Sequence, residues 1–332
     1  MCDSPREIFM LKVLKGGLAA ALVIAGATFA QAQTYPAKPI KLIVPFPPGG
    51  GTDNLSRYIS DRLNKALGWN FIVENKPGAA GNLALDTTAK SAPDGYTMVM
   101  AQTDNVVLNP LLYDKLSYDP VKDLAPVAML ASGTAVLVVK ADSPHKSIGD
   151  IVAAAKAKPG TVSFGSPGIG TAAHLALELW QGANAIKLNH IPYRGIAQSL
   201  PDLLGGQVDM YMGSIPTMLG QIKEGKVRAI AVTGTQRSAL LPDVPTYTEA
   251  GAPGVVIASV WGLMVPANTP AAIIGQLNAE VNKILDNPES KAQILSTGAE
   301  VLRGSPKDLE TLYASDRARL APVVKASGIR LE

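Results

Sequence analysis

Short apolar runs alternate with helical stretches along the chain, and this alternation occurs in two separate blocks. In the first block the predicted strands are IKLIVPF (40–46), NFIVEN (70–75) and YTMVMAQ (96–102). In the second block they are VSFGS (162–166), KLNHIPY (187–193), VDMYMGS (208–214) and VRAIAVTG (227–234). Strands that alternate with helices are typical of parallel sheets joined by right-handed crossovers. We therefore predict an α/β fold with mainly parallel sheets flanked by helices.

Two longer apolar runs separate the blocks. VAMLASGTAVLVVK (127–140) and the run near 255–265 are long for single strands, so we interpret them as segments that pass between two lobes. The 332 residues also suit two domains of roughly 150 residues each. The prediction places residues 34–134 and 259–332 in lobe 1 and residues 135–258 in lobe 2, with a double crossover hinge.

The N-terminal residues 1–32 predict a secretory signal peptide. Residues Gly16–Ala30 carry no charge, Lys12 and Lys15 precede them, and Ala30-Gln31-Ala32 gives the pattern read by signal peptidase. A membrane-spanning helix would need about 20 apolar residues, more than this run provides. We expect cleavage after Ala32 and a periplasmic protein, with Met10 as an alternative start.

Composition excludes several classes of partner and cofactor. With 30 Lys+Arg against 27 Asp+Glu and only 5% aromatic residues, nucleic acid is not expected as a partner. The one cysteine, Cys2, lies in the predicted signal, and His145, His174 and His190 are far apart in the sequence. We therefore expect no zinc site and no other metal.

A first glycine-rich loop, PFPPGGGTD (45–53), lies between a predicted strand and a predicted helix. Glycines there let backbone N–H groups approach an anion, and the helix dipole favours it. The loop lacks the Gly-Lys-Ser/Thr of nucleotide-binding loops and holds no Lys or Arg, which favours a carboxylate over a triphosphate. Asp53 is interpreted as a first-turn acid paired with Arg57. The alternative is a tight turn without a ligand.

A second glycine-rich loop, GSPGIGTAAH (165–174), has the same context in the second block. It matches the G-x-G-x-x-A pattern of dinucleotide sites, but the acid expected about 20 residues later is missing, so no such cofactor is expected. Ser166 and Thr171 offer further donors, whereas His174 points either to the cleft or into the core. Two such loops facing each other across a hinge would form a receptor for a carboxylate.

Other polar residues leave more than one function open. Arg194 is either a charge partner for a ligand or a solvated side chain, and Asp209 needs a partner or faces the cleft. Common hydrolase motifs are absent, which favours a protein that is not an enzyme. An exported hydrolase with a spatially assembled serine, and His174 or His190 as its base, remains the alternative.

Several motifs closely resemble the Bug/TctC family of periplasmic substrate-binding proteins, which serve tripartite tricarboxylate transporters. They include YPAKPIKLIVPFPPGGGTDNLSR (35–57), ENKPGAAGN (74–82), FGSPGIGTAAHLALEL (164–179) and IPYRGIAQSLPDLLGGQVDM (191–210). The resemblance implies a type II periplasmic-binding fold that closes on its ligand like a Venus flytrap. It also implies delivery of a dicarboxylate, tricarboxylate, acidic amino acid or aromatic acid to a membrane permease.

The resemblance further implies which residues contact the ligand. From lobe 1 they are Phe46, Gly50, Gly51, Thr52 and Asp53, with Thr103 nearby; from lobe 2 they are Ser166, Gly170, Thr171 and His174, with Tyr193, Gly195 and Asp209 as wall residues. We expect a non-catalytic, monomeric receptor. A ligand sensor of the same fold without a transport role is the second alternative.

Overall fold

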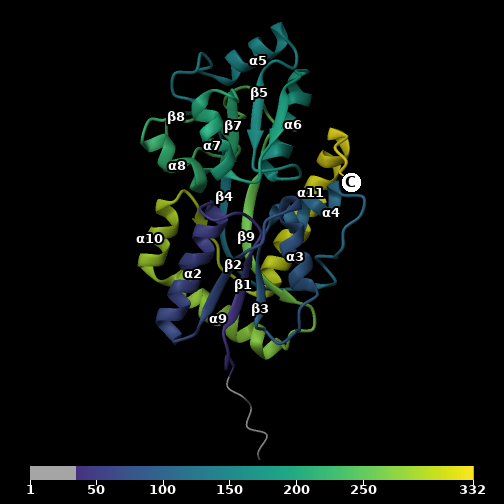
Figure 1. Cartoon of the computed structure of the whole chain (residues 1–332), viewed down its shortest axis with the longest axis vertical. Helices are drawn as coiled ribbons and strands as arrows, with labels where there is room; N and C mark the ends of the chain where they lie inside the picture. Colours follow the sequence, from purple (N-terminus) through teal and green to yellow (C-terminus); the bar gives the residue numbers. More distant parts are fainter. Residues whose placement is uncertain (1–34, 332) are drawn as a thin grey trace, which may run out of the picture. The chain divides into compact units, whose positions relative to one another are not determined.

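The computed structural model of the chain describes residues 35–331 (Figure 1). The predicted signal peptide, residues 1–32, lies outside the described residues. Within residues 35–331, no helix combines the length and the apolar character needed to span a bilayer.

The first group of strands contains the β/α units of the first block. Strand β1 (Ile40–Val44) is parallel to β2 (Phe71–Asn75) and to β3 (Thr97–Gln102). Strand β3 pairs antiparallel with β9 (Ala258–Pro266), which pairs antiparallel with the first part of β4 (Leu124–Lys140). The short strand β10 (Glu300–Val301) also pairs with β4. Four of the five β1 residues are buried, as its continuous apolar sequence predicts.

The second group of strands contains the units of the second block. Strand β7 (Met210–Ser214) is parallel to β5 (Ser163–Ser166), which is parallel to β6 (Asn189–Pro192). Both β7 and β8 (Val227–Val232) pair antiparallel with the last part of β4. All these strands belong to one 10-stranded sheet, with the order β2-β1-β3-β9-β4-β7-β5-β6 along its main path.

Strand β4 changes partners where it passes from one group to the other. Thr134 pairs with Ala258 of β9, and the next residue, Ala135, pairs with Ser214 of β7. Strand β9 runs beside β4 in the opposite direction (Figure 1). The pairs among β1, β2 and β3 and among β5, β6 and β7 are parallel as predicted, whereas β8 pairs antiparallel with β4. Strands β4 and β9 also make the sheet mixed, because one leaves the first group and the other returns to it.

The helices follow the strands in the predicted rhythm. In chain order they are α2 (Gly51–Leu67), the short η1 (Ala79–Gly81), α3 (Asn82–Ala89), the π-helical turn η2 (Asp104–Leu108), α4 (Asn109–Leu112), α5 (Ile148–Ala157), α6 (Ala172–Asn184), α7 (Ile196–Gly205), α8 (Ile215–Lys223), α9 (Ala271–Asp286), α10 (Pro288–Ser296) and α11 (Pro306–Ser327). Two of the helix ends show common capping chemistry. Ser147 caps α5 by accepting from the N–H of Asp150, and Gly68 ends α2 with φ 67°.

Helix α6 is anchored in the main hydrophobic core, and this fixes the position of its first turn. Its residues Leu175, Leu177 and Trp180 are fully buried. The ring of Trp180 packs edge-on against Tyr247 with 5.8 Å between ring centroids. The helix start at Thr171 therefore belongs to a rigid element, which suits a binding site.

Candidate functional site

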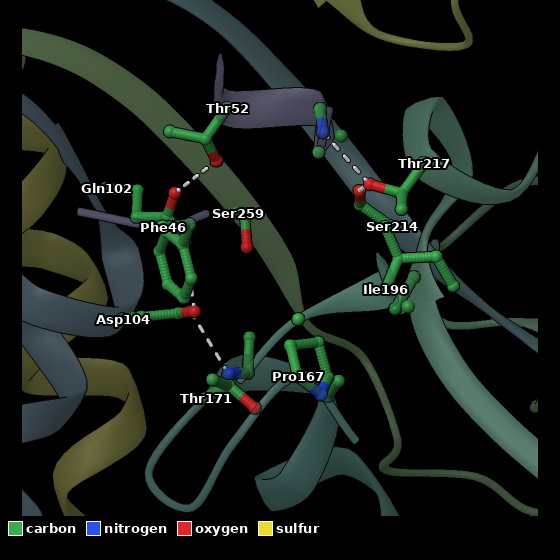
Figure 2. A pocket seen from close by; sticks show the side chains of 18 of the residues that line it. Phe46, Thr52, Gln102, Asp104, Pro167, Thr171, Ile196, Ser214, Thr217 and Ser259 are labelled. Atoms are coloured by element: carbon green, nitrogen blue, oxygen red, sulfur yellow. Dashed lines mark hydrogen bonds between the residues drawn. The ribbon is translucent and has the colours of Figure 1, made fainter. Parts of the chain in front are cut away.

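A cavity lies where the beginnings of four helices meet the middle of the sheet. It is lined by Gly50–Thr52 at the start of α2, Thr171–Ala173 at the start of α6, Gly195–Ala197 at the start of α7, and Ser214 and Thr217 at the start of α8. The lining residues surround about 760 Å³ not filled by protein atoms, part of it open to solvent. Figure 2 shows Thr52, Gln102 and Asp104 on one side of this space and Ile196, Ser214 and Thr217 on the other.

The starts of α2 and α8 approach each other closely. The N–H of Gly51 donates to Oγ1 of Thr217 at 3.1 Å, and this oxygen is 2.7 Å from Oγ of Ser214. A Cβ on residue 51 would lie only 3.2 Å from Cβ of Pro216 and 3.2 Å from Oγ1 of Thr217. Glycine at this position therefore permits contact between elements of the two strand groups.

The start of α6 is organised by the glycine-rich loop before it. Gly168 and Gly170 have φ values of 151° and 85°, which side chains rarely adopt. Oγ1 of Thr171 donates to the carbonyl of Gly168 at 2.8 Å and accepts from the N–H of His174 at 3.3 Å. Thr171 is thus the N-cap of α6, with its backbone on the cavity wall.

An oriented chain of hydrogen bonds crosses the other wall of the cavity. Nε1 of Trp261 donates to Oγ1 of Thr52 at 2.9 Å, and Oγ1 of Thr52 donates to Oε1 of Gln102 at 2.8 Å. Nε2 of Gln102 then donates to Oδ2 of Asp104 at 2.9 Å. The indole can only donate and the ionised carboxylate of Asp104 can only accept, so these two ends together fix the orientation of the Gln102 amide.

Asp104 connects this chain to the second group of strands. Its Oδ1 accepts the N–H of Ala172, the first residue of α6, at 3.0 Å. Burial raises the pKa of Asp104 to about 6, against the effect of the hydrogen bonds from Ala172 and Gln102. Among the described lining residues there is no Lys, Arg or His. The cavity thus offers hydroxyls and helix N–H groups to a ligand, together with one buried carboxyl group.

The apolar part of the lining supplies most of the contact surface. Phe46 and Pro47 come from the first glycine-rich loop, Pro167 from the second, and Ile196 from α7. Trp261 of β9 is 2% exposed. A mainly apolar cavity with a few oriented polar groups is typical of sites for small organic molecules.

The structure brings part of the predicted site to this cavity. The predicted residues on its wall are Phe46, Gly50, Gly51, Thr52, Thr171 and Gly195. The predicted residues outside its lining are Asp53, Thr103, Ser166, Gly170, His174, Tyr193 and Asp209. These seven have other partners, which explain their positions.

Asp53 holds the first glycine-rich loop together. Its carboxylate accepts from the N–H of Gly49 at 2.9 Å, from Nδ2 of Asn75 at 2.8 Å and from Nε of Arg57 at 3.0 Å. Burial alone would raise the pKa of Asp53. The hydrogen bonds outweigh this effect and lower the pKa, and the hydrogen bond from Arg57 contributes most. The predicted pairing of Asp53 with Arg57 is present in the structure.

Thr103 and Gly170 lie next to the cavity lining. Oγ1 of Thr103 accepts the N–H of Val260 at 2.9 Å and so joins the end of β3 to β9. The N–H of Gly170 donates to Nδ1 of His174 at 3.3 Å. Both contacts fix the backbone on which the lining residues stand.

His174 lies in the core beneath the second loop. It is 6% exposed, its ring stacks on that of His190 with 4.3 Å between centroids, and its Nε2 is 3.5 Å from Glu178. Oγ of Ser166 is 2.8 Å from Nε2 of His190, whose pKa burial lowers to about 4. This pair is the serine–histidine arrangement that the hydrolase alternative requires, but neither residue lines the cavity.

The cavity lining also excludes Tyr193, Arg194 and Asp209. Tyr193 donates to Oδ2 of Asp202 at 2.7 Å. With Arg194 it lines a neighbouring depression, which shares Phe46, Pro47 and Pro167 with the cavity. Asp209 has the partner that its apolar surroundings require, because Oδ2 accepts from both N and Oγ of Ser163 at 2.7 Å. Asp209 precedes β7, whereas the cavity lies at the carboxyl end of this strand, at Ser214.

Several lining residues were not predicted from the sequence. Gln102 and Asp104 lie at the carboxyl end of β3, and Ser214 and Thr217 follow the carboxyl end of β7. Ligands of α/β proteins bind at the carboxyl ends of strands, so strand position was the available signal. Residues 35–331 contain no group of three or more His, Cys, Asp or Glu side chains placed to hold a metal ion.

Comparisons with known proteins agree on one family. The model of the tripartite tricarboxylate transporter family receptor, TctC, matches residues 55–329. BugT of Bordetella pertussis is 36% identical over 303 residues, which are 91% of this chain and 93% of BugT. The structure of Rpa4515 of R. palustris with adipate matches with a TM-score of 0.86 and 33% identity, covering 89% of this chain and 99% of that one. MatC of Rhodopseudomonas palustris with bound malate matches with a TM-score of 0.83 and 31% identity, covering 87% and 100%.

These matches confirm the predicted family, and the likeness to solved periplasmic binding proteins of this type confirms the predicted fold class. The family is one of binding proteins and not of enzymes, which decides against the hydrolase alternative. The chain belongs to the TctC family, the periplasmic solute-binding receptors of tripartite tricarboxylate transporters.

Proposed function

We propose that this protein captures a small carboxylate in the cavity and delivers it to the membrane permease of a tripartite transporter. The observation that carries the proposal is the convergence of the first turns of α2, α6, α7 and α8 on one cavity. The N–H groups of a first turn have no partner within the helix, and each helix start favours an anion by about 0.3–1 kcal/mol. Such donors bind a carboxylate without a cationic side chain.

The solved relatives support the class of ligand. Rpa4515 is described with adipate and MatC with malate, and both ligands are small carboxylic acids. The absence of Lys, Arg and His from the described lining agrees with a ligand held by oriented dipoles and hydroxyls. We propose direct contacts from Phe46, Gly50, Gly51, Thr52, Thr171 and Gly195.

The other predicted site residues act indirectly in this proposal. Asp53 shapes the first loop, Gly170 and His174 support the start of α6, and Thr103 ties β3 to β9. Ser166, Tyr193 and Asp209 stabilise the surrounding strands and loops of the second group through His190, Asp202 and Ser163. None of them needs to touch the ligand.

Capture occurs when two lobes close on the ligand. Lobe 1 consists of residues 34–134 and 259–332, and lobe 2 consists of residues 135–258. The contacts of Gly51 with Thr217 and of Asp104 with Ala172 join these two parts of the chain. A ligand that contacts both parts binds the closed form more tightly than the open form and so shifts the population towards closure.

Export is part of the same proposal. The predicted signal peptide, cleaved after Ala32, would place the mature protein in the periplasm of a Gram-negative bacterium as a monomer. Membership of a family of periplasmic binding proteins supports this location.

Calorimetry with the purified mature protein tests the binding function. The panel contains dicarboxylates, tricarboxylates, acidic and neutral amino acids, and aromatic acids. We expect at least one carboxylate to bind, and Thr171→Ala to weaken its binding more than Thr161→Ala, whose hydroxyl contacts Lys158 on an exposed turn. A folded protein that binds no anion in the panel would contradict the proposal.

Gene deletion tests the transport role against the sensor alternative. Loss of uptake of the bound carboxylate, restored by the wild-type gene, supports a receptor that supplies a permease. Intact uptake with lost induction of a carboxylate-responsive gene would instead favour a sensor of the same fold.

A further inference from the structure

Asp104 is the one side chain of the described cavity lining that is ionised at neutral pH. It is 4% exposed, and its hydrogen-bond donors are the N–H of Ala172 and the amide of Gln102. Neither donor carries a charge, and Asp104 forms no ion pair within the described residues. A buried carboxylate without a counter-charge is costly, so a cation brought by a ligand would stabilise the complex.

Asp104 also occupies one of the four helix starts. Its Oδ1 accepts the first N–H of α6, the group that a ligand carboxylate would otherwise reach. The first turn of α2 also holds an acid, Asp53, whereas the starts of α7 and α8 have none. A ligand carboxylate is thereby directed towards those starts, and the ligand group that faces Asp104 must donate hydrogen bonds.

The orientation of Gln102 strengthens this requirement. Its Oε1 accepts from Thr52, so its Nε2 is committed to Asp104 and cannot turn to a ligand without breaking the chain that begins at Trp261. The wall formed by Gln102 and Asp104 therefore presents mainly acceptor capacity to the cavity, since a carboxylate has four lone-pair directions and two are used here.

We propose that Asp104 selects ligands that combine one carboxylate with an ammonium group, that is, zwitterionic amino acids, over diacids of the same length. The inference rests on the proposed function, because the ligand carboxylate is still assigned to the helix starts. Opposite charges in a poorly hydrated site attract strongly, and two carboxylates there repel each other. The ligands named for Rpa4515 and MatC are diacids, so this chain would differ from those relatives in its preference.

Calorimetry on the wild-type protein with chain-matched ligands tests the proposal. For each length from four to six carbons, the diacid is compared with the ω-amino acid, the α-amino acid and the plain monoacid. At about pH 8, above the pKa of Asp104, the protein binds the better amino acid at least about tenfold more tightly than the diacid. The affinity for the plain monoacid lies between the affinities for the amino acid and the diacid.

Asp104→Asn removes the charge and keeps the shape of the side chain. This variant loses the preference, so the ratio of the two dissociation constants moves at least about tenfold towards the diacid. Asp243→Asn is the matched control, because Asp243 is exposed and lies outside the cavity lining, and it leaves the ratio unchanged. Circular dichroism verifies that both variants are folded.

Two results would overturn the proposed ligand preference without contradicting the proposed function as a carboxylate receptor. One is a wild-type protein that binds diacids at least as tightly as the amino acids at about pH 8. The other is diacid binding that strengthens below about pH 6 with uptake of one proton, measured in two buffers of different ionisation heat. In that case Asp104 would bind the second carboxyl group as a neutral acid. Both readouts use the wild-type protein, so they stand if Asp104→Asn does not fold.

A folded protein that binds none of the ligands, at any pH, would contradict the proposed function itself. Failure of the receptor function is therefore distinguished from failure of the ligand preference.

Discussion

The N–H of Gly51 donates to Oγ1 of Thr217 at 3.1 Å, so the first turn of α2 is joined to the first turn of α8 across the cavity. This contact connects residues 166 positions apart. A Cβ on residue 51 would lie 3.2–3.3 Å from the side chains of Ser214, Pro216 and Thr217, so glycine at this position allows the close approach without displacing them.

Gly51→Ala is therefore expected to weaken ligand binding by about tenfold, or about 1.4 kcal/mol. The new Cβ would lie 3.2 Å from Cβ of Pro216 and 3.3 Å from Oγ of Ser214, so closure would have to move α8. Calorimetry with the carboxylate found by the panel measures the loss. Gly182→Ala in α6, where a Cβ would meet nothing within 4 Å, is the control and should bind normally. Equal ligand affinities of Gly51→Ala and Gly182→Ala would show that the close approach of α2 to α8 at Gly51 is not required for binding.

The stability of the ligand-free protein should respond to the pH through Asp104. Because burial raises the pKa of Asp104 from 3.8 to about 6, the folded state binds a proton more readily than the unfolded state between these values. The ionised carboxylate of Asp104 therefore lowers the free energy of unfolding by its full amount above about pH 6. This loss of stability disappears below about pH 4, where the carboxyl group is protonated in both states. The difference in the free energy of unfolding between Asp104→Asn and the wild type should therefore shift in favour of the variant by up to roughly 3 kcal/mol between about pH 4 and neutral pH. Urea denaturation across this range measures the difference, and a constant difference would contradict the assignment.

Thr52→Val should destabilise the protein by roughly 1–3 kcal/mol, because it leaves Nε1 of Trp261 and Oε1 of Gln102 without their shared partner. Thr87→Val is the matched control. Its hydroxyl donates to the carbonyl of Leu83 on an exposed face of α3, so its removal should change the free energy of unfolding by less than about 0.5 kcal/mol. Chemical denaturation compares the two, and equal losses would contradict a structural role for the hydrogen-bond chain.

Asp53→Ala should cost roughly 1–3 kcal/mol of stability at neutral pH, because the N–H of Gly49 and the amide of Asn75 lose a buried acceptor. Since the folded pKa of Asp53 is lowered below 3.8, its contribution is present above about pH 4 and lost as the pH falls through the folded value. Denaturation at neutral and acidic pH measures this. Asp61→Asn, which removes an exposed pairing with Lys65, should have little effect at either pH.

The local pattern of the sequence predicted the elements and the two loops well. Apolar runs gave the positions of β1, β3, β5 and β7, because buried strands need continuous apolar residues whatever surrounds them. The pairing of Asp53 with Arg57 follows from their spacing of four residues in the first turns of α2. Such features require no knowledge of distant contacts.

The placement of polar side chains depended on partners far away in the sequence. Asp209 is satisfied by Ser163, 46 residues earlier, and Asp104 reaches Ala172, 68 residues later. His174 faces His190 in the core, although its position one turn into a helix suited the cleft equally well. A single sequence does not contain the distances that decide these cases.

The change of partners in β4 between Thr134 and Ala135 bears on how the molecule unfolds. Because one unbroken strand supplies hydrogen bonds to both groups, neither group can lose its order without exposing strand edges in the other. We therefore expect heat to melt the protein in a single transition, with the calorimetric enthalpy equal to the van't Hoff enthalpy, despite its size.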